Sequence, residues 1–213
     1  MTLTLYQLPP SPNNIKVRVA FGIKGIDAEF VDFGFNADRS QVVEVSGQPL
    51  TPTIKHNDVV LFGSGAILRY LDANFREGPQ LFSATQEGMR EIEEWEVWAN
   101  NTFSGAMIPV ARQLFSGQDD PTATEAANAL LRELAPRIEA ALESKPFLTG
   151  EAPNAADVTL YPWVSYTAID KDSVPAESPA AFFAARIQLP AEFSKTRAWL
   201  GRMAAFDRRP FLV

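Results

Sequence analysis

The residue pattern of this chain changes near Gly78 and Pro79, from a mixture of short strands and helices to helices alone. Before this point, alternating apolar runs are separated by turn-forming residues, which is typical of an α/β domain. After it, apolar residues recur with helical spacing. The Gly-Pro pair and the polar residues that follow have the composition of a linker. We therefore expect a first domain over residues 1–78, a linker over 79–86 and an all-helical domain over 87–213.

The first domain is expected to have a thioredoxin-like βαβαββα order. The pattern predicts strands over 2–7, 28–33, 53–55 and 59–61, the last two joined by a tight turn at 56–58. It also predicts three helices. The first begins near Asn13 or Asn14, either of which can cap it, the second spans 42–45, and the third begins at Ser64. The expected fold class is thus α/β followed by all-α.

The second domain is expected to contain helices over 91–115, 124–142 and 193–205. In the first of these, Gly105 and Pro109 are candidate bends. Asn154 and Asp157 have the spacing of a capping box and predict the start of a further, buried helix.

Composition excludes several classes of function. A net charge of −7 argues against nucleic acid or an anionic membrane as the main partner, since either needs a clustered basic face. No cysteine occurs, which excludes disulfides and catalysis by a protein thiol, and His56 is the only histidine, so no metal site is expected. The start of the chain has no signal-peptide pattern and no run spans a bilayer, so a cytoplasmic protein is expected.

Three stretches of the first domain combine polar side chains with helix or strand ends. Ser11 and Asn13 stand at the start of a helix, Thr51-Pro52 precedes a strand, and Gly63-Ser64 joins an apolar strand to a helix. Because the first turn of a helix has unpaired amides, Ser64 marks a small anion site. A plain helix cap is the simpler interpretation of Ser64, and a proline turn with a cap is the simpler interpretation of Ser11 and Asn13.

Taken together, these stretches resemble the thiol-binding domain of the glutathione transferase superfamily, and residues 147–163 resemble a segment of its helical domain. The resemblance implies that Ser11 hydrogen-bonds the thiol of glutathione and lowers its pKa at the positive end of the helix dipole. Asn13 would donate a second bond to the sulfur. Tyr6, on the first strand, is the alternative activating residue.

The resemblance also implies how the rest of glutathione is held. A cis peptide before Pro52 would turn the Thr51 backbone toward the cysteinyl part, whereas an ordinary edge-strand proline is the alternative. Ser64 would bind the γ-glutamyl carboxylate with its hydroxyl and amide.

Two positions depart from the family pattern. Gly63 stands where an acid normally pairs with the ligand's ammonium, and Leu50 stands where relatives often carry a polar residue for the glycyl end. Gln48 is the candidate that reaches the glycyl end instead. A carboxylate from elsewhere in the protein or from a second subunit is a candidate replacement for the one missing at Gly63.

The resemblance therefore implies an enzyme with a detoxification role that uses glutathione as co-substrate, without a metal. Its thiolate would attack a small hydrophobic electrophile, or reduce a mixed disulfide or peroxide. The alternative is a non-catalytic binding or assembly module with an impaired glutathione site. A homodimer is implied in either case, with Phe62, Phe75 and Trp95 as apolar anchors.

Overall fold

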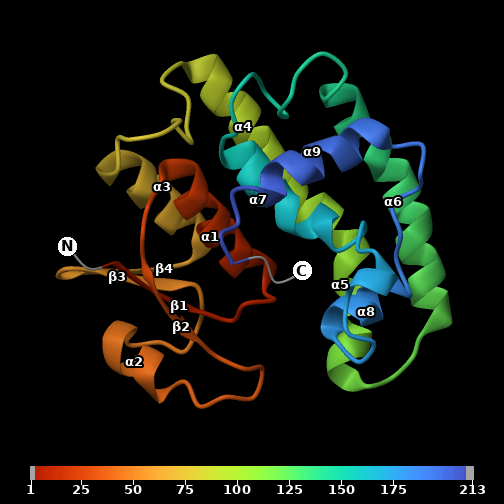
Figure 1. Cartoon of the computed structure of the whole chain (residues 1–213), viewed down its shortest axis with the longest axis horizontal. Helices are drawn as coiled ribbons and strands as arrows, with labels where there is room; N and C mark the ends of the chain where they lie inside the picture. The colour runs from red at the N-terminus through yellow and green to blue at the C-terminus, as the bar shows by residue number, and fades with distance from the viewer. Residues whose placement is uncertain (1–2, 210–213) are drawn as a thin grey trace. The chain divides into compact units, whose positions relative to one another are not determined.

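The structure is a computed structural model of the chain, and it describes residues 3–209. These residues divide into two compact units: one comprises 3–83 together with 204–209, and the other comprises 84–203. The first unit is α/β, and the second consists of helices joined by loops with no strand among its described residues, so the predicted fold class is confirmed (Figure 1).

The first unit is built on a four-stranded sheet of order β2-β1-β3-β4. β1 pairs parallel with β2 and antiparallel with β3, which is antiparallel to β4. The elements are β1 (Leu3–Gln7), α1 (Pro12–Lys24), β2 (Glu29–Asp32), α2 (Ser40–Ser46), β3 (Thr53–His56), β4 (Val59–Phe62) and α3 (Ser64–Asn74). This is the predicted thioredoxin-like order.

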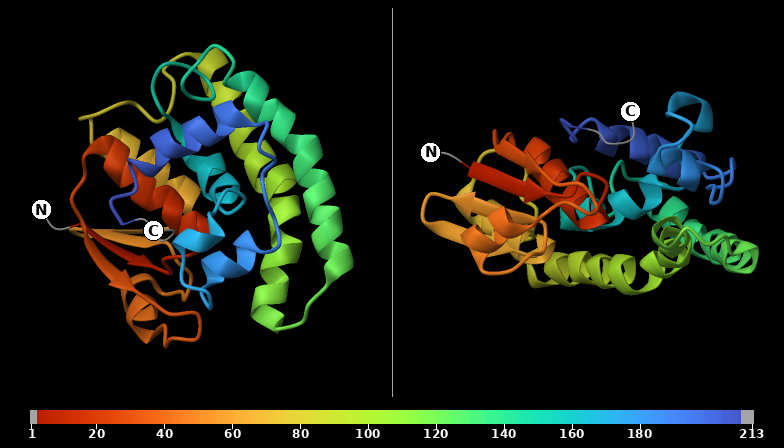
Figure 2. Two further views of the ribbon diagram at one scale, coloured as in Figure 1. Left: turned by 45° about the vertical axis from the view of Figure 1, so that its right-hand side comes forward. Right: turned by 90° about the horizontal axis from the view of Figure 1, so that it is seen from below.

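The core of this unit lies on both sides of the sheet. α1 and α3 pack together on one face, and α2 lies on the other (Figures 1 and 2). Leu5 of β1 and Ile54 of β3 are fully buried, as expected for the two central strands. Tyr6, which follows Leu5 and points to the opposite face of the sheet, is also buried, so both faces of β1 are covered.

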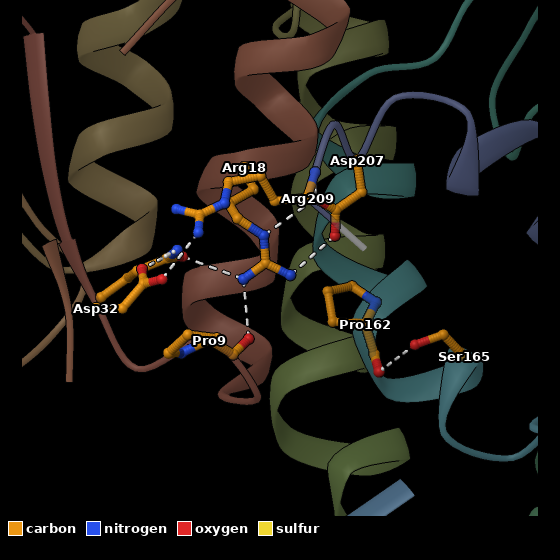
Figure 3. A network of polar contacts seen from close by, with 8 residues as sticks. Pro9, Arg18, Asp32, Pro162, Ser165, Asp207 and Arg209 are labelled. Atoms are coloured by element: carbon orange, nitrogen blue, oxygen red, sulfur yellow. Dashed lines mark hydrogen bonds and ion pairs between the residues drawn. The ribbon is translucent and has the colours of Figure 1, made fainter. Parts of the chain in front are cut away.

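The last described residues, 204–209, belong to the first unit although they are far from it in sequence. Asp207 accepts two hydrogen bonds from Arg18 of α1, with Nε–Oδ1 at 3.0 Å and Nη2–Oδ2 at 2.8 Å. Both residues are buried, at 2% and 5% exposure. Figure 3 shows this paired geometry, which is the strong bidentate form of an arginine–carboxylate contact.

The helices of the second unit are joined by loops of different lengths. They are α4 (Gln86–Trp98), η1 (Ala99–Phe103), α5 (Ser104–Ser116), α6 (Pro121–Ala141), α7 (Ala155–Ser165), η2 (Lys171–Ser173), α8 (Pro179–Ala184) and α9 (Ser194–Ala204). No helix within residues 3–209 has both the length and the apolar character needed to cross a membrane.

The single long helix predicted over 91–115 is wrong in its details. It begins at Gln86, capped by the Thr85 side chain, and it is interrupted by the π-helical turn η1, whereas Gly105 and Pro109 both lie within α5. The buried residues Ile92, Trp95, Ala99 and Phe103 keep three- to four-residue spacing through this turn. Hydrophobic periodicity therefore gives no sign of the π turn.

Trp95 was expected to anchor a dimer, and the structure instead places it inside the second unit. It is 6% exposed, lies edge-on to Trp98, and is covered by the guanidinium of Arg137 at 4.5 Å from its ring centre. Cation–π and aromatic packing therefore account for this residue within one chain.

The predicted capping box at Asn154 and Asp157 is confirmed. Asp157 Oδ2 accepts from the Asn154 N–H at 3.1 Å, and Oδ1 accepts from Leu148 N and Trp199 Nε1 at 2.9 and 2.8 Å. One buried carboxylate thus ties the start of α7 to the preceding loop and to α9.

Asp157 is expected to make the stability of the protein depend on pH. Burial raises its pKa to about 6, although three N–H groups hydrogen-bond its carboxylate. The unfolded value is about 3.9, so between about pH 4 and 6 the folded state binds more protons than the unfolded state. The contribution of Asp157 to the free energy of unfolding therefore increases as the pH falls from 7 to 4. A pKa difference of about two units corresponds to about 3 kcal/mol.

The Asp157→Asn variant isolates this effect because an amide does not titrate. We expect the wild-type free energy of unfolding, measured by urea titration, to rise relative to that of the variant between pH 7 and pH 4. A difference that stays constant, or that shrinks toward low pH, would contradict the raised pKa.

Candidate functional site

The hydroxyl of Ser11 stands at the start of α1 without a capping role. Ser11 is the N-cap residue, and its carbonyl accepts hydrogen bonds from the N–H groups of Asn14 and Ile15 at 2.9 and 3.0 Å. Its side chain forms no capping hydrogen bond, so helix capping does not explain why a serine is present. The hydroxyl is thus open to a ligand at the positive end of the helix dipole.

Asn13 and Ser64 meet across two helices. Asn13 is exposed on the first turn of α1, and its Oδ1 accepts a hydrogen bond from Ser64 Oγ at 3.3 Å. This bond leaves the Nδ2 hydrogens of Asn13 available. The contact joins the two helix starts that the sequence marked as separate motifs.

Ser64 is the first residue of α3 rather than its cap, which is Gly63. The first hydrogen bond inside this end of the helix runs from Ile67 N to Gly63 O at 3.1 Å. The amides of residues 64–66 therefore precede any possible intrahelical acceptor, and together with the Ser64 hydroxyl they can receive an anion.

Gly63 adopts a backbone conformation that favours glycine, with φ of 84° and ψ of 121°. A Cβ built at this position meets no atom within 4 Å. A side chain therefore has space here, but its backbone would be strained.

The peptide bond between Thr51 and Pro52 is cis, as predicted. Pro52 is buried, and its carbonyl accepts from Gly63 N at 3.1 Å, which ties this loop to the start of α3. Thr51 forms no backbone–backbone hydrogen bond with any other residue of the described range 3–209. Its peptide groups are therefore free to pair with an extended ligand, as the edge of a strand does.

Asn14 is a site residue that the sequence did not identify, beyond offering it as a possible helix cap. It is fully buried, and its Nδ2 donates to Thr51 Oγ1 at 3.3 Å. Its Oδ1 is buried with no partner among the described residues. The available signal was a polar residue on a helix face shared with Val17 and Phe21, both of which are buried.

Tyr6 is paired with Thr53 across β1 and β3, and its side chain packs into the core of the first unit. It is 7% exposed and belongs to an apolar cluster with Phe33 and Val42. The phenol ring thus has a packing role, which accounts for an aromatic residue on β1.

Gln48 is engaged inside its own loop. Its Nε2 lies within hydrogen-bonding distance of Ser46 Oγ, Leu50 O and Thr53 Oγ1, and its Oε1 accepts from Leu50 N at 2.6 Å. Reaching a ligand would require breaking these contacts. Leu50 itself is 66% exposed and apolar, so neither residue is arranged to receive a carboxylate in this structure.

Hydrogen bonds therefore link Asn13 to Ser64, Asn14 to Thr51, and Gly63 to Pro52, which follows Thr51. Ser11 lies two residues from Asn13 on the same helix start. Within residues 3–209, no group of three or more His, Cys, Asp or Glu side chains is arranged to hold a metal ion.

The first unit is thioredoxin-like and is followed by a helical unit, which is the architecture of the glutathione transferase fold. Family models agree: residues 5–79 match the glutathione S-transferase N-terminal domain, and residues 121–202 match its C-terminal domain. The chain belongs to the glutathione S-transferase family.

Individual relatives support this assignment. Glutathione S-transferase 3 of Zea mays is 30% identical over 166 residues, which cover 73% of each chain. Glutathione transferase GST 23 of Zea mays is 24% identical over 200 residues, covering 92% of this chain and 82% of the relative. A crystal structure of a glutathione S-transferase from Rhodospirillum rubrum F11 has a TM-score of 0.77 at 20% identity, covering 98% and 89% of the two chains, and shows the shared fold.

Proposed function

We propose that this protein is a glutathione transferase that binds reduced glutathione at Ser11, Asn13, Thr51 and Ser64. The observation that carries the proposal is the Asn13–Ser64 bond, which unites the start of α1 with the start of α3. One helix start then faces the thiol and the other faces the γ-glutamyl carboxylate of the same ligand.

Each residue has a distinct part in the proposed reaction. The Ser11 hydroxyl donates to the sulfur, Asn13 Nδ2 adds a second donor, and the Thr51 peptide groups align the cysteinyl part. The Ser64 hydroxyl and the amides of 64–66 hold the carboxylate. The thiol proton leaves to solvent, and the thiolate forms a C–S bond to an electrophilic carbon of a small hydrophobic substrate as the leaving group departs with the electron pair of its bond to carbon. With a mixed disulfide the thiolate instead attacks one sulfur and releases the other as a thiol. With a peroxide it attacks one oxygen, so that the O–O bond breaks to give a sulfenic acid and an alcohol, and a second glutathione thiol then forms the disulfide and water.

Calorimetric titration with reduced glutathione tests the proposal, followed by turnover assays with an aryl halide and with a peroxide. Binding together with turnover of either substrate would support the enzyme and identify its reaction class. Binding without turnover would favour the second candidate, a non-catalytic module of the same fold. The exposed Leu50 and the missing acid at Gly63 favour this second candidate. Absence of any binding up to about ten millimolar would contradict the proposed function.

We expect wild-type binding to be weak, in the millimolar range, because the ligand's ammonium meets no carboxylate at position 63. A charged hydrogen bond is worth roughly 1.5–3 kcal/mol. Gly63→Glu should therefore tighten glutathione binding by about ten- to a hundredfold, measured by the same titration.

Gly63→Ala is the matched control for this substitution. The positive φ of 84° strains any side chain, at a cost of roughly 1–3 kcal/mol. The free energy of unfolding should fall by this amount in both variants, but only Gly63→Glu should bind glutathione more tightly. Micromolar binding by the wild-type protein would mean that another acid already pairs with the ammonium.

We also propose that the protein is a homodimer. Phe62 of β4 and Val97 of α4 are apolar and 50% and 58% exposed, as expected for side chains that a second subunit covers. Sedimentation equilibrium at micromolar concentration should give about twice the chain mass of 23.5 kDa. A monomer under these conditions would exclude a partner subunit as the source of the missing acid.

A further inference from the structure

The guanidinium of Arg18 is hydrogen-bonded both to Asp207 in segment 204–209 and to the loop that carries Ser11. Besides the two bonds to Asp207, its Nη1 donates to the carbonyl of Pro9 at 2.8 Å (Figure 3). Pro9 lies two residues before Ser11, and Ser11 N donates to Leu8 O at 2.9 Å, so residues 8–11 form one turn. From this geometry we infer that Arg18 and Asp207 are positioning residues for the Ser11 hydroxyl.

Other polar contacts extend this connection into a ring. Arg18 Nη1 also donates to Gln7 Oε1 at 3.1 Å, and Gln7 Nε2 donates to Asp32 Oδ1 at 2.8 Å. Asp32 Oδ2 in turn accepts from Arg209 Nη2 at 3.0 Å. The segment 204–209 thus contacts β2 through Asp32 and α1 through Arg18, and the buried side chain of Gln7 on β1 links these two residues.

The burial of Arg18 is what makes it a rigid positioning group. A guanidinium presents its donors in a fixed plane, so the two Asp207 oxygens determine where Nη1 points. Removing the carboxylate would leave a buried, uncompensated charge, and the guanidinium would move toward other acceptors or solvent. The Pro9 carbonyl would then lose its anchor. A residue close to the carboxyl end of the chain therefore controls a loop at its beginning.

This matters for the thiol because a preorganised donor acts only within narrow limits of distance and direction. The inference rests on the proposed function of Ser11. Asp207 and Arg18 do not touch the ligand in this account, so they should affect ionisation of the bound thiol and kcat more than KM.

Two variants test the inference, with a matched control in the same segment. Asp207→Asn weakens the grip on the guanidinium, and Arg18→Lys keeps the charge but cannot reach Asp207 and Pro9 together. Arg208→Gln is the control, because Arg208 pairs with Asp27 through exposed side chains in the same segment. We expect both variants, but not the control, to raise the pKa of bound glutathione thiol and to lower kcat by about tenfold or more, with KM changed less.

Hydrogen exchange supplies a readout that does not depend on glutathione. The Ser11 amide should exchange at least tenfold faster in both variants than in wild type, under conditions in which the amides of β3 keep their protection. If the variants melt at a lower temperature while Ser11 exchange, thiol pKa and kcat stay unchanged, Arg18 and Asp207 are merely structural and the inference is overturned. If wild type does not bind glutathione, the proposed function fails, and the exchange of Ser11 alone decides whether the loop is positioned by Asp207.

Discussion

Replacing Ser11 with alanine is expected to lower glutathione-dependent turnover by roughly ten- to a thousandfold, the range for losing one preorganised donor. We expect kcat/KM to fall because a smaller fraction of the bound thiol is ionised in the variant. Stability should change little, because the Ser11 hydroxyl makes no capping bond and the helix keeps its N-terminal carbonyl contacts. The pKa of bound glutathione, followed by thiolate absorbance against pH, should rise in the variant.

Two comparisons make this result specific. Ser11→Thr keeps a hydroxyl at the same position and should retain a large part of the activity, whereas Tyr6→Phe should leave the thiol pKa and turnover unchanged because the Tyr6 ring is packed with Phe33 and Val42. If Tyr6→Phe raises the thiol pKa and Ser11→Ala does not, the assignment of the activating residue is wrong.

The parts of the fold that were predictable depend on short-range signals. The strand and helix order of the first unit follows from alternating and helical spacing, and the hairpin between β3 and β4 is set by Asn57, whose φ of 55° suits asparagine. The capping box at Asn154 and Asp157 spans three residues. In each case the residues that determine the structure are neighbours in the chain, so their pattern is visible without the tertiary fold.

The parts that escaped prediction depend on contacts between distant residues. Asn14 faces Thr51 across 37 positions, and Arg18 pairs with Asp207 across 189, so neither partner can be recognised by spacing. The position of Ser64 inside α3 rather than at its cap depends on the φ of Gly63, which the residue type permits but does not dictate.

Gly22 illustrates how strongly one of these distant contacts constrains the chain. It lies within α1, where glycine normally costs about 0.5–1 kcal/mol relative to alanine. A Cβ at this position would lie 1.7 Å from the carbonyl oxygen of Phe206, which is backbone and cannot rotate away. The segment 204–209 therefore approaches the helix at the one place where a side chain is missing, next to the Arg18–Asp207 pair.

Gly22→Ala is consequently expected to destabilise the protein by roughly 3–5 kcal/mol, the cost of breaking a buried ion pair, despite the better helix propensity of alanine. For a chain of this size that corresponds to a fall in melting temperature of about 6–20 °C. Gly201→Ala in α9 is the control, since a Cβ there meets no atom within 4 Å and the residue is exposed. The free energy of unfolding of Gly201→Ala should rise by up to about 1 kcal/mol, because alanine has the higher helix propensity. Equal melting temperatures for the two variants would mean that segment 204–209 does not pack against α1 in solution, and the positioning of Ser11 through Asp207 would lose its physical basis.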